Sequence, residues 1–370
     1  MTTPAAIPFM HLTPGADAGA IRAAIDRVIA RGWFILGPEL TAFETEFAQA
    51  SGAAHAVGVG TGTDAIALAL RALGIGPGDE VITAPLSAAY SALAIMMAGA
   101  TPVFADIDID RLTLDPSQVD ALVTPRTAAI LPVHLYGQPA DMTAIAAIAR
   151  RHNLVIVEDA SQAHLAKSEG RPVGTIGAAG AFSFYPTKNL GALGDAGAII
   201  TGDAALADKH RRLRNGGQKD RYHHLEFGVN TRLDEMQAAI LRERLMLLPA
   251  WTDRRREIAA RYRAALVGAP VIVPPEKDPG HVYHLFPVRT AHRAQAQAHL
   301  RNNGIETLIH YPVPIPRQPA LAGIPAGCPH ADRVCDEVFS LPLHPALSND
   351  EVDRVADAMH RFSAANADGR

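Results

Sequence analysis

The sequence predicts an α/β protein in which helices cover both faces of a mostly parallel β-sheet. Apolar strand segments alternate with helical segments between residues 54 and 160, which is the order of repeated βαβ units. The strand segments are apolar at consecutive positions, as in strands that are buried on both faces. A chain of 370 residues, 48% of them hydrophobic, has ample material for this core and for a second domain.

Each element follows from the spacing of its apolar residues. Residues 18–32 predict an amphipathic helix that Gly32 ends. Its apolar face is formed by Ile21, Ile25, Val28 and Ile29. Seven segments predict the strands of the large sheet: 54–60, 80–85, 101–107, 127–137, 154–160, 181–185 and 197–203. Helices are predicted among the first five of these strands, at 63–74, 87–99 and 140–152.

A change of character near residue 245 predicts a second, smaller domain. Residues 241–266 predict long helices that are broken around Pro249. Proline-rich strand segments follow at 271–275 and 281–288. We therefore expect two domains: a large α/β domain with an N-terminal arm over 1–245, and a small α+β domain over 246–370.

Composition and charge argue against several classes of protein. The formal net charge is −4 and no long run of Lys or Arg occurs, so nucleic acid is not expected as the main partner. Cys328 and Cys335 fit neither a zinc pattern nor a disulfide framework, and we expect reduced thiols in the cytoplasm. The first residues lack a basic segment followed by a long apolar stretch, so no signal peptide is expected.

One uncharged stretch has the length of a membrane span. No charged residue occurs over 81–105, but Pro85, Gly99 and Pro102 divide the stretch into strand, helix and strand. A buried crossover unit explains this pattern better than a spanning helix does. No membrane partner is therefore expected.

Familiar ligand motifs are incomplete. The dinucleotide fingerprint G-x-G-x-x-G would need glycine where Thr63 stands, so NAD binding is not expected. A calcium loop beginning at residue 106 would need glycine at Arg111 and glutamate at Ser117. His223 and His224 are adjacent and have no Cys/His partner pattern, so no metal site is expected.

Three features at the ends of strands can carry chemistry. The segment "GTGTD" at 60–64 is either a phosphate cradle at a helix N-terminus or a Gly-rich turn with one of its threonines as N-cap. Asp159 follows Glu158 at the end of a buried strand, where parallel sheets bind ligands; the alternative is a helix N-cap. Lys188 is either a desolvated amine that forms Schiff bases or a lysine that reaches back to solvent.

Together these three features predict pyridoxal 5′-phosphate (PLP) as a cofactor. The cradle would hold the phosphate, and Asp159 would keep the pyridine nitrogen protonated, so that the ring accepts electron density. Lys188 would hold the aldehyde. This role explains why Lys188 would need a dry, fixed position: its amine must act as a nucleophile and as a base.

Seven phrases of the sequence are similar to those of a known family, in the family's order, from about residue 30 to 345. They are GTGTDAIALALRALGIGPGDEV, PVHLYGQPADM, VEDASQAH, GAFSFYPTKNLGALGDAGAI, GVNTRLDEMQAAIL, GIETLIHYPVP and SLPLHP. The chain resembles the DegT/DnrJ/EryC1/StrS family of sugar aminotransferases. The resemblance implies the aspartate-aminotransferase type fold (fold type I) and homodimers with active sites at the subunit interface.

The resemblance also implies roles for individual residues. Lys188 would be the Schiff-base lysine, Asp159 would pair with the pyridine nitrogen, and Gln162 would bind the phenolic oxygen of the cofactor. The other cofactor contacts would be Gly62, Thr63, Asp64 and Ser183 at the phosphate, Asn230 reaching it from the neighbouring subunit, and Ala160 on one face of the ring. The substrate candidates, each with surface polarity or an interface bond as the alternative, are Lys219, Tyr222, Arg232, His310 and Tyr311.

Two positions depart from the family pattern. Ala88 occupies the place of the aromatic residue or histidine that stacks on the other ring face, and Tyr90 lies two residues on but on a different helix face. Pro316 stands where members often have a histidine, which could alter the substrate pocket.

We therefore expect a PLP-dependent aminotransferase that moves an amino group from L-glutamate to a nucleotide-linked keto sugar. The segment before Asn230 favours a dTDP-linked 3-keto-6-deoxyhexose. Lys188 argues against the dehydrase branch of the family, which has a histidine at that position. The alternatives are a keto-cyclitol or a keto sugar without a nucleotide, and a PLP-binding regulator that is not an enzyme.

Overall fold

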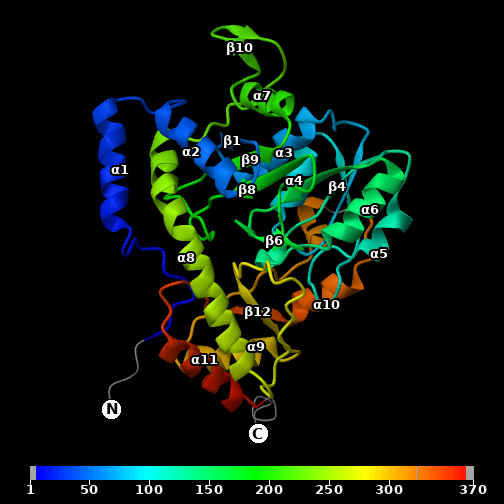
Figure 1. Cartoon of the computed structure of the whole chain (residues 1–370). Coiled ribbons are helices and arrows are strands. Elements are labelled where there is room, and N and C mark those ends of the chain that lie inside the picture. The colour runs from blue at the N-terminus through cyan, green and yellow to red at the C-terminus, as the bar shows by residue number, and fades with distance from the viewer. Residues whose placement is uncertain (1–5, 322, 364–370) are drawn as a thin grey trace.

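The structure is a computed structural model that describes residues 6–321 and 323–363, and a seven-stranded sheet forms its centre (Figure 1). Six strands of this sheet run in one direction, and β9 runs in the opposite direction. Each strand overlaps one of the seven predicted segments, so the mostly parallel sheet is confirmed, although the predicted strand 127–137 ends at Leu131 and the strand predicted at 181–185 is Ala179–Ser183. In spatial order they are β1 (His55–Val59), β9 (Gly197–Thr201), β8 (Ala179–Ser183), β5 (Val155–Asp159), β4 (Thr127–Leu131), β2 (Glu80–Thr83) and β3 (Thr101–Phe104).

Helices cover both faces of the sheet, as predicted. Ile199 belongs to the buried cluster that contains α3 and α4, whereas its neighbour Ile200 belongs to the cluster that contains α2 and α8. Because successive strand residues point to opposite faces, both faces are buried. The helices around the sheet are α1 (Ala18–Arg31), α2 (Pro38–Ala50), α3 (Gly62–Ala72), α4 (Tyr90–Met97), α5 (Pro116–Val119), α6 (Met142–His152), α7 (Ala204–Leu213) and α8 (Glu235–Ala265).

Helix α8 is a single helix of 31 residues that runs from the sheet into the C-terminal part of the chain (Figure 1). The predicted break at Pro249 is therefore wrong. An internal proline removes a backbone hydrogen bond and costs about 3 kcal/mol. Here Pro249 is exposed, while Leu248 is buried against the sheet and Tyr262 is buried in the C-terminal core. Packing on both sides of the proline stabilises the continuous helix.

The C-terminal part of the chain has its own core. Its antiparallel strands pack against α9, α11 and the second half of α8. Ile7 from the N-terminal arm joins this core and pairs with Ile305. The predicted domain boundary between residues 245 and 246 falls inside the continuous helix α8. The structure therefore does not mark a boundary there, and the division into two domains stays a prediction. The elements of this part are β12 (Phe286–Arg289), α9 (Arg293–Asn302), α10 (Pro329–Glu337), β13 (Val338–Leu341) and α11 (Asn349–Arg361).

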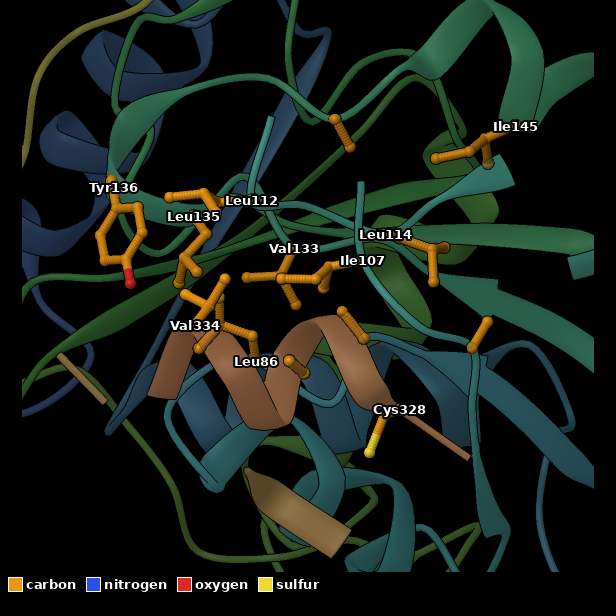
Figure 2. Close-up of a cluster of buried hydrophobic side chains, with 14 of the residues drawn as sticks. Leu86, Ile107, Leu112, Leu114, Val133, Leu135, Tyr136, Ile145, Cys328 and Val334 are labelled. Atoms are coloured by element: carbon orange, nitrogen blue, oxygen red, sulfur yellow. The ribbon is translucent and has the colours of Figure 1, made fainter. Parts of the chain in front are cut away.

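Helix α10 returns to the large sheet and closes its core. Figure 2 shows Val334 of this helix beside Val133 and Leu86, with Cys328 at the edge of the cluster. Both cysteines are buried and free.

The uncharged stretch 81–105 forms β2, α4 and β3, as predicted. Among residues 6–321 and 323–363, no helix combines the length and the apolar character that crossing a membrane requires.

The topology brings functional segments to one edge of the sheet. The strands β1, β8, β5, β4, β2 and β3 point the same way, so their carboxyl ends share an edge, which is where α/β sheets bind ligands. The register pairs Asp159 of β5 with Ala181 of β8. The loop from β1 enters α3 at this same edge, and the turn that carries Lys188 follows β8.

Candidate active site

Asp159 is the last residue of β5, and its backbone N–H, its carbonyl and both of its carboxylate oxygens form hydrogen bonds. Its N–H donates to the carbonyl of Pro132 (2.9 Å), and its carbonyl accepts from the N–H of His134 (3.0 Å). In the side chain, Oδ1 accepts from the N–H of Ser161 (3.1 Å) and Oδ2 accepts from the hydroxyl of Ser91 (2.7 Å). The residue is 5% exposed. No helix begins after it, so the alternative of a helix N-cap does not apply.

The neighbouring carboxylate of Glu158 has a structural role. It is fully buried and accepts from the N–H groups of Gly174, Ile176 and Gly177, each at 2.7 Å. The Nε2 atom of His134 lies 3.1 Å from it. These bonds tie the loop before β8 to the sheet. Adjacent strand residues point to opposite faces, and this separates the two carboxylates.

Lys188 lies in a tight turn after β8, where its N–H donates to the carbonyl of Tyr185 (2.8 Å). Burial lowers the pKa of its amine from 10.5 to about 8, and the negative charge of Asp159 opposes part of this shift. The amine is therefore neutral in a useful fraction of molecules near pH 8, as a nucleophile or base requires. Judged by its exposed surface, Lys188 is partly buried, and its lowered pKa favours the interpretation as a reactive amine over that of a solvent-reaching lysine.

Three histidines feel the charge of Lys188 and have uncharged rings. Burial first, and then the positive charge of Lys188, lowers the pKa of His164 to about 3 and that of His310 to about 4. The same causes place the pKa of His284 well below its ordinary value. Of these three, only His310 was a candidate from the sequence. His164 ends the phrase VEDASQAH, but its proximity to Lys188, like that of His284, depends on the fold.

The turn between β1 and α3 matches a phosphate cradle in its backbone. A Cβ atom on Gly62 would lie 2.6 Å from the Cβ of Ser183 and 3.2 Å from the Oγ of Ser161, so only glycine allows this approach. Thr61 is the N-cap of α3 and accepts from the N–H of Asp64 (3.0 Å). Within the described residues, no protein acceptor meets the N–H groups of Gly62 and Thr63. The N-cap and the cradle are thus properties of the same turn.

Gln162 connects two tyrosines at the same edge. Its Oε1 accepts from the N–H of Tyr136 (2.7 Å), and its Nε2 donates to the hydroxyl of Tyr311 (3.0 Å). Burial, with a contribution from the charge of Asp159, raises the pKa of Tyr311 to about 12, so its hydroxyl is neutral at physiological pH. The hydroxyl of Tyr136 donates to the carbonyl of His310. The structure therefore brings His310 and Tyr311 to the edge that holds Asp159.

The other predicted contacts lie on a projecting segment. Lys219 and Tyr222 belong to the hairpin of β10 (Gln218–Asp220) and β11 (His223–His224), which extends beyond α7 in Figure 1. Both residues and Asn230 are exposed. Arg232 donates to the side-chain oxygen of Asn215 (3.0 Å). Within the described part of one chain, no hydrogen bond or ion pair links these residues to Asp159 or Lys188.

The structure also shows where Ala88, Tyr90 and Pro316 lie, the residues discussed above as departures from the family pattern. Tyr90 is the first residue of α4 and is 63% exposed, so the geometry of one chain does not support a stacking role for it. Ala88 is partly buried before this helix. Pro316 is buried in a short 3₁₀ turn that is fixed by a bond from the N–H of Ile315 to the carbonyl of Pro85 (2.8 Å).

A cavity of about 390 Å³ opens beside Lys188. Its lining includes Arg255 of α8, which donates to the carbonyls of Tyr283, His284 and Leu343. Lys188, Arg244, Arg254 and Arg255 line the cavity together with the carboxylate of Asp17, so cationic groups outnumber anionic ones in its lining. Among the described residues that line it, Lys188 is the one that the sequence predicted for the site.

These residues fit PLP and do not form a metal site. The free N–H groups at Gly62 and Thr63 suit a phosphate, Asp159 is a fixed and buried carboxylate, and Lys188 is a desolvated amine. Among residues 6–321 and 323–363, no cluster of three or more His, Cys, Asp or Glu side chains could hold a metal ion.

Comparison with known proteins agrees with this geometry. A sequence model of the DegT/DnrJ/EryC1/StrS aminotransferase family matches residues 16–360. The chain is 49% identical over 366 residues to dTDP-3-amino-3,4,6-trideoxy-alpha-D-glucose transaminase of Streptomyces venezuelae, with 96% of each protein covered. It is 46% identical to dTDP-3-amino-3,6-dideoxy-alpha-D-galactopyranose transaminase of Aneurinibacillus thermoaerophilus, over 92% of this chain and 95% of that protein.

A solved structure shows the same fold. The crystal structure of S. venezuelae DesV in complex with a ketimine intermediate matches with a TM-score of 0.93 at 49% sequence identity, covering 96% of this chain and 98% of that chain. The expected fold type I is thereby confirmed.

Proposed function

Since this chain belongs to the DegT/DnrJ/EryC1/StrS aminotransferase family, we propose that it transfers an amino group from L-glutamate to a nucleotide-linked keto sugar. That the chain is a PLP-dependent aminotransferase follows from its family. The two relatives named above are transaminases of dTDP-linked 3-amino sugars. Their names support C3 of a dTDP-linked 6-deoxy ketohexose as the position that is aminated.

The observation that carries this proposal is the desolvated amine of Lys188 at the edge that holds Asp159. When bound, PLP supplies an aldehyde that takes up the amino group and a ring that accepts electron density. Asp159 would hold the proton on the ring nitrogen, and the N–H groups of Gly62 and Thr63 would hold the phosphate with Ser183. Lys188 would bind the aldehyde and, once released, remove the proton from the Cα atom of the donor.

The remaining predicted residues would orient the substrates. Gln162 would face the phenolic oxygen of the cofactor, while His310 and Tyr311 would contact the sugar or the donor carboxylate. Asp64 would contribute less through its N–H, because Thr61 already accepts from it.

We also propose a homodimer in which each active site is shared. Tyr222 is 77% exposed and Phe227 is 84% exposed on and beside the projecting hairpin, although large apolar side chains gain free energy when they are buried. A second copy of the chain would cover them. It would also bring Asn230, Lys219, Tyr222 and Arg232 to the phosphate and diphosphate. The free buried cysteines favour the reducing cytoplasm as the location.

A trapping experiment and a substrate panel test the proposal. Borohydride reduction of PLP-loaded protein should attach the cofactor covalently at Lys188, as mass spectrometry of peptides would show, and Lys188→Ala should not be labelled. In unreduced PLP-loaded protein, L-glutamate should support faster amination of dTDP-linked keto sugars than of UDP-linked sugars, keto-cyclitols or keto sugars without a nucleotide. Labelling without transfer to any of these acceptors would favour the regulator hypothesis.

The donor and acceptor steps can be tested separately. Lys219→Ala should raise the KM for the nucleotide sugar without slowing the half-reaction with L-glutamate, because only the sugar carries a diphosphate. An equal loss in both half-reactions would contradict a diphosphate contact at Lys219.

A further inference from the structure

Ser91 donates its hydroxyl hydrogen to Oδ2 of Asp159 over 2.7 Å, although 68 residues separate the two in the chain. Both side chains are buried, and Ser91 is 2% exposed. Ser91 is the second residue of α4, so the sheet and this helix together fix its position. The Oγ of Ser87 lies 3.3 Å from the Oγ of Ser91 and is also buried.

Hydrogen-bond chemistry gives these contacts a direction. An ionised carboxylate only accepts hydrogen bonds, and a hydroxyl has one hydrogen to donate. When Asp159 is ionised, Ser91 must therefore donate to it, and Ser87 must then donate to Ser91. The order of donation is Ser87 to Ser91 to Asp159. Each carboxylate oxygen can accept two hydrogen bonds, so Oδ2 can accept from Ser91 and still meet the ring nitrogen of PLP.

We propose that Ser91, supported by Ser87, is a positioning residue that orients Asp159 and keeps the shared proton on the ring nitrogen of PLP. A hydroxyl that donates to a carboxylate stabilises its negative charge. The carboxylate then competes less well for the proton that it shares with the ring nitrogen. The bond also prevents rotation of the carboxylate, since Ser161 holds the other oxygen. This proposal rests on the assignment of Asp159 to the ring nitrogen in the proposed function.

The test compares Ser91→Ala with wild-type protein, both loaded with PLP that is labelled with ¹⁵N in the ring. At one fixed pH, the ¹⁵N chemical shift in Ser91→Ala should move toward that of unprotonated pyridine. The dissociation constant of PLP should also rise, because the carboxylate of Asp159 is no longer held toward the ring nitrogen. Ser91→Thr keeps the hydroxyl and should restore both values. Ser51→Ala removes a buried hydroxyl that has no partner in the described residues and should change neither value.

A double substitution shows whether Ser91 acts through Asp159. In an Asp159→Asn background, Ser91→Ala should cause no further rise in the dissociation constant of PLP. An unchanged ¹⁵N shift in Ser91→Ala, or an equal effect in both backgrounds, would overturn the proposal. Should Ser91→Ala fail to fold, Ser87→Ala replaces it and must move the ¹⁵N shift in the same direction by a smaller amount. Wild-type protein without a PLP adduct at Lys188 would instead overturn the proposed function.

Discussion

Gly62 and Ser183 approach so closely that a methyl group on Gly62 would lie 2.6 Å from the Cβ atom of Ser183. The first turn of α3 therefore meets the end of β8 with no space between them. The free N–H groups of Gly62 and Thr63 belong to this first turn. A cofactor phosphate held by this turn would contact two elements that are more than 100 residues apart in the chain.

Gly62→Ala should reduce the affinity for PLP strongly, because the helix N-terminus must move away from Ser183. Overpacking of this kind costs about 1–3 kcal/mol of folding free energy. Fluorescence titration with PLP and urea unfolding of the apoprotein would measure the two effects. Gly19→Ala is the matched control, since a Cβ atom there meets nothing within 4 Å. Unchanged PLP affinity in Gly62→Ala would contradict the cradle.

The two neighbouring carboxylates should respond to substitution in opposite ways. Glu158→Gln replaces one acceptor oxygen with a donor opposite buried N–H groups, so we expect a loss of about 2–4 kcal/mol of stability. Asp159→Asn should lose less stability but most of the transaminase activity. Urea unfolding and a glutamate half-reaction assay would separate the two outcomes. Similar stability losses in both variants would contradict the structural role of Glu158.

Lys188→Met should stabilise the apoprotein at pH 7. The folded-state pKa of Lys188 is about 8, below its ordinary value of 10.5, so folding disfavours the ammonium form and wild-type protein bears this cost fully below pH 8. The cost disappears as the pH rises from 8 to 10.5, because the amine then loses its proton in both states. Urea unfolding across this range should show a stability difference that decreases with pH.

The control for this prediction is Lys167→Met, at an exposed lysine, where the difference should not decrease over the same interval. A constant difference at Lys188 would indicate that its amine is solvated in the folded protein.

Mixed dimers should restore activity if the active sites are shared. Lys188→Ala and Asn230→Ala proteins should each be weakly active or inactive. After subunit exchange, half of a random mixture is heterodimer, and one of its two sites contains both native residues, so about a quarter of the wild-type activity should return. Analytical ultracentrifugation of the mixture would confirm the dimer. No recovery after demonstrated exchange would place Asn230 in the site of its own chain, or outside it.

Much of the fold could be predicted from the sequence because it depends on short-range patterns. The seven strands are apolar at consecutive positions, and the turns between them contain Gly and Pro. Helix α8 was the exception: Pro249 indicated a break, yet burial of Leu248 on one side and Tyr262 on the other keeps the helix continuous. A proline inside a helix costs a few kcal/mol, and the burial of large side chains on both sides of it can outweigh this cost.

The site was predictable in part for the same reason. Lys188, Asp159 and the turn at Gly62 each follow a strand, and parallel strands bring their ends together. Sequence analysis assigned the ligand-facing role to Asp159, but residue spacing gave no physical reason to prefer it over the adjacent Glu158. The structure decides this through the three N–H groups that bind Glu158.

The sequence by itself determined the α/β sheet, the positions of the lysine and aspartate at strand ends, and the family to which the chain belongs. These properties depend on the order and spacing of residues. Only the tertiary structure decided that Ser91 bonds to Asp159, that three neutral histidines feel the charge of Lys188, and that Tyr90 faces solvent. Such relations join residues that are distant in sequence, and they exist only after packing has removed water and brought the side chains within hydrogen-bond distance.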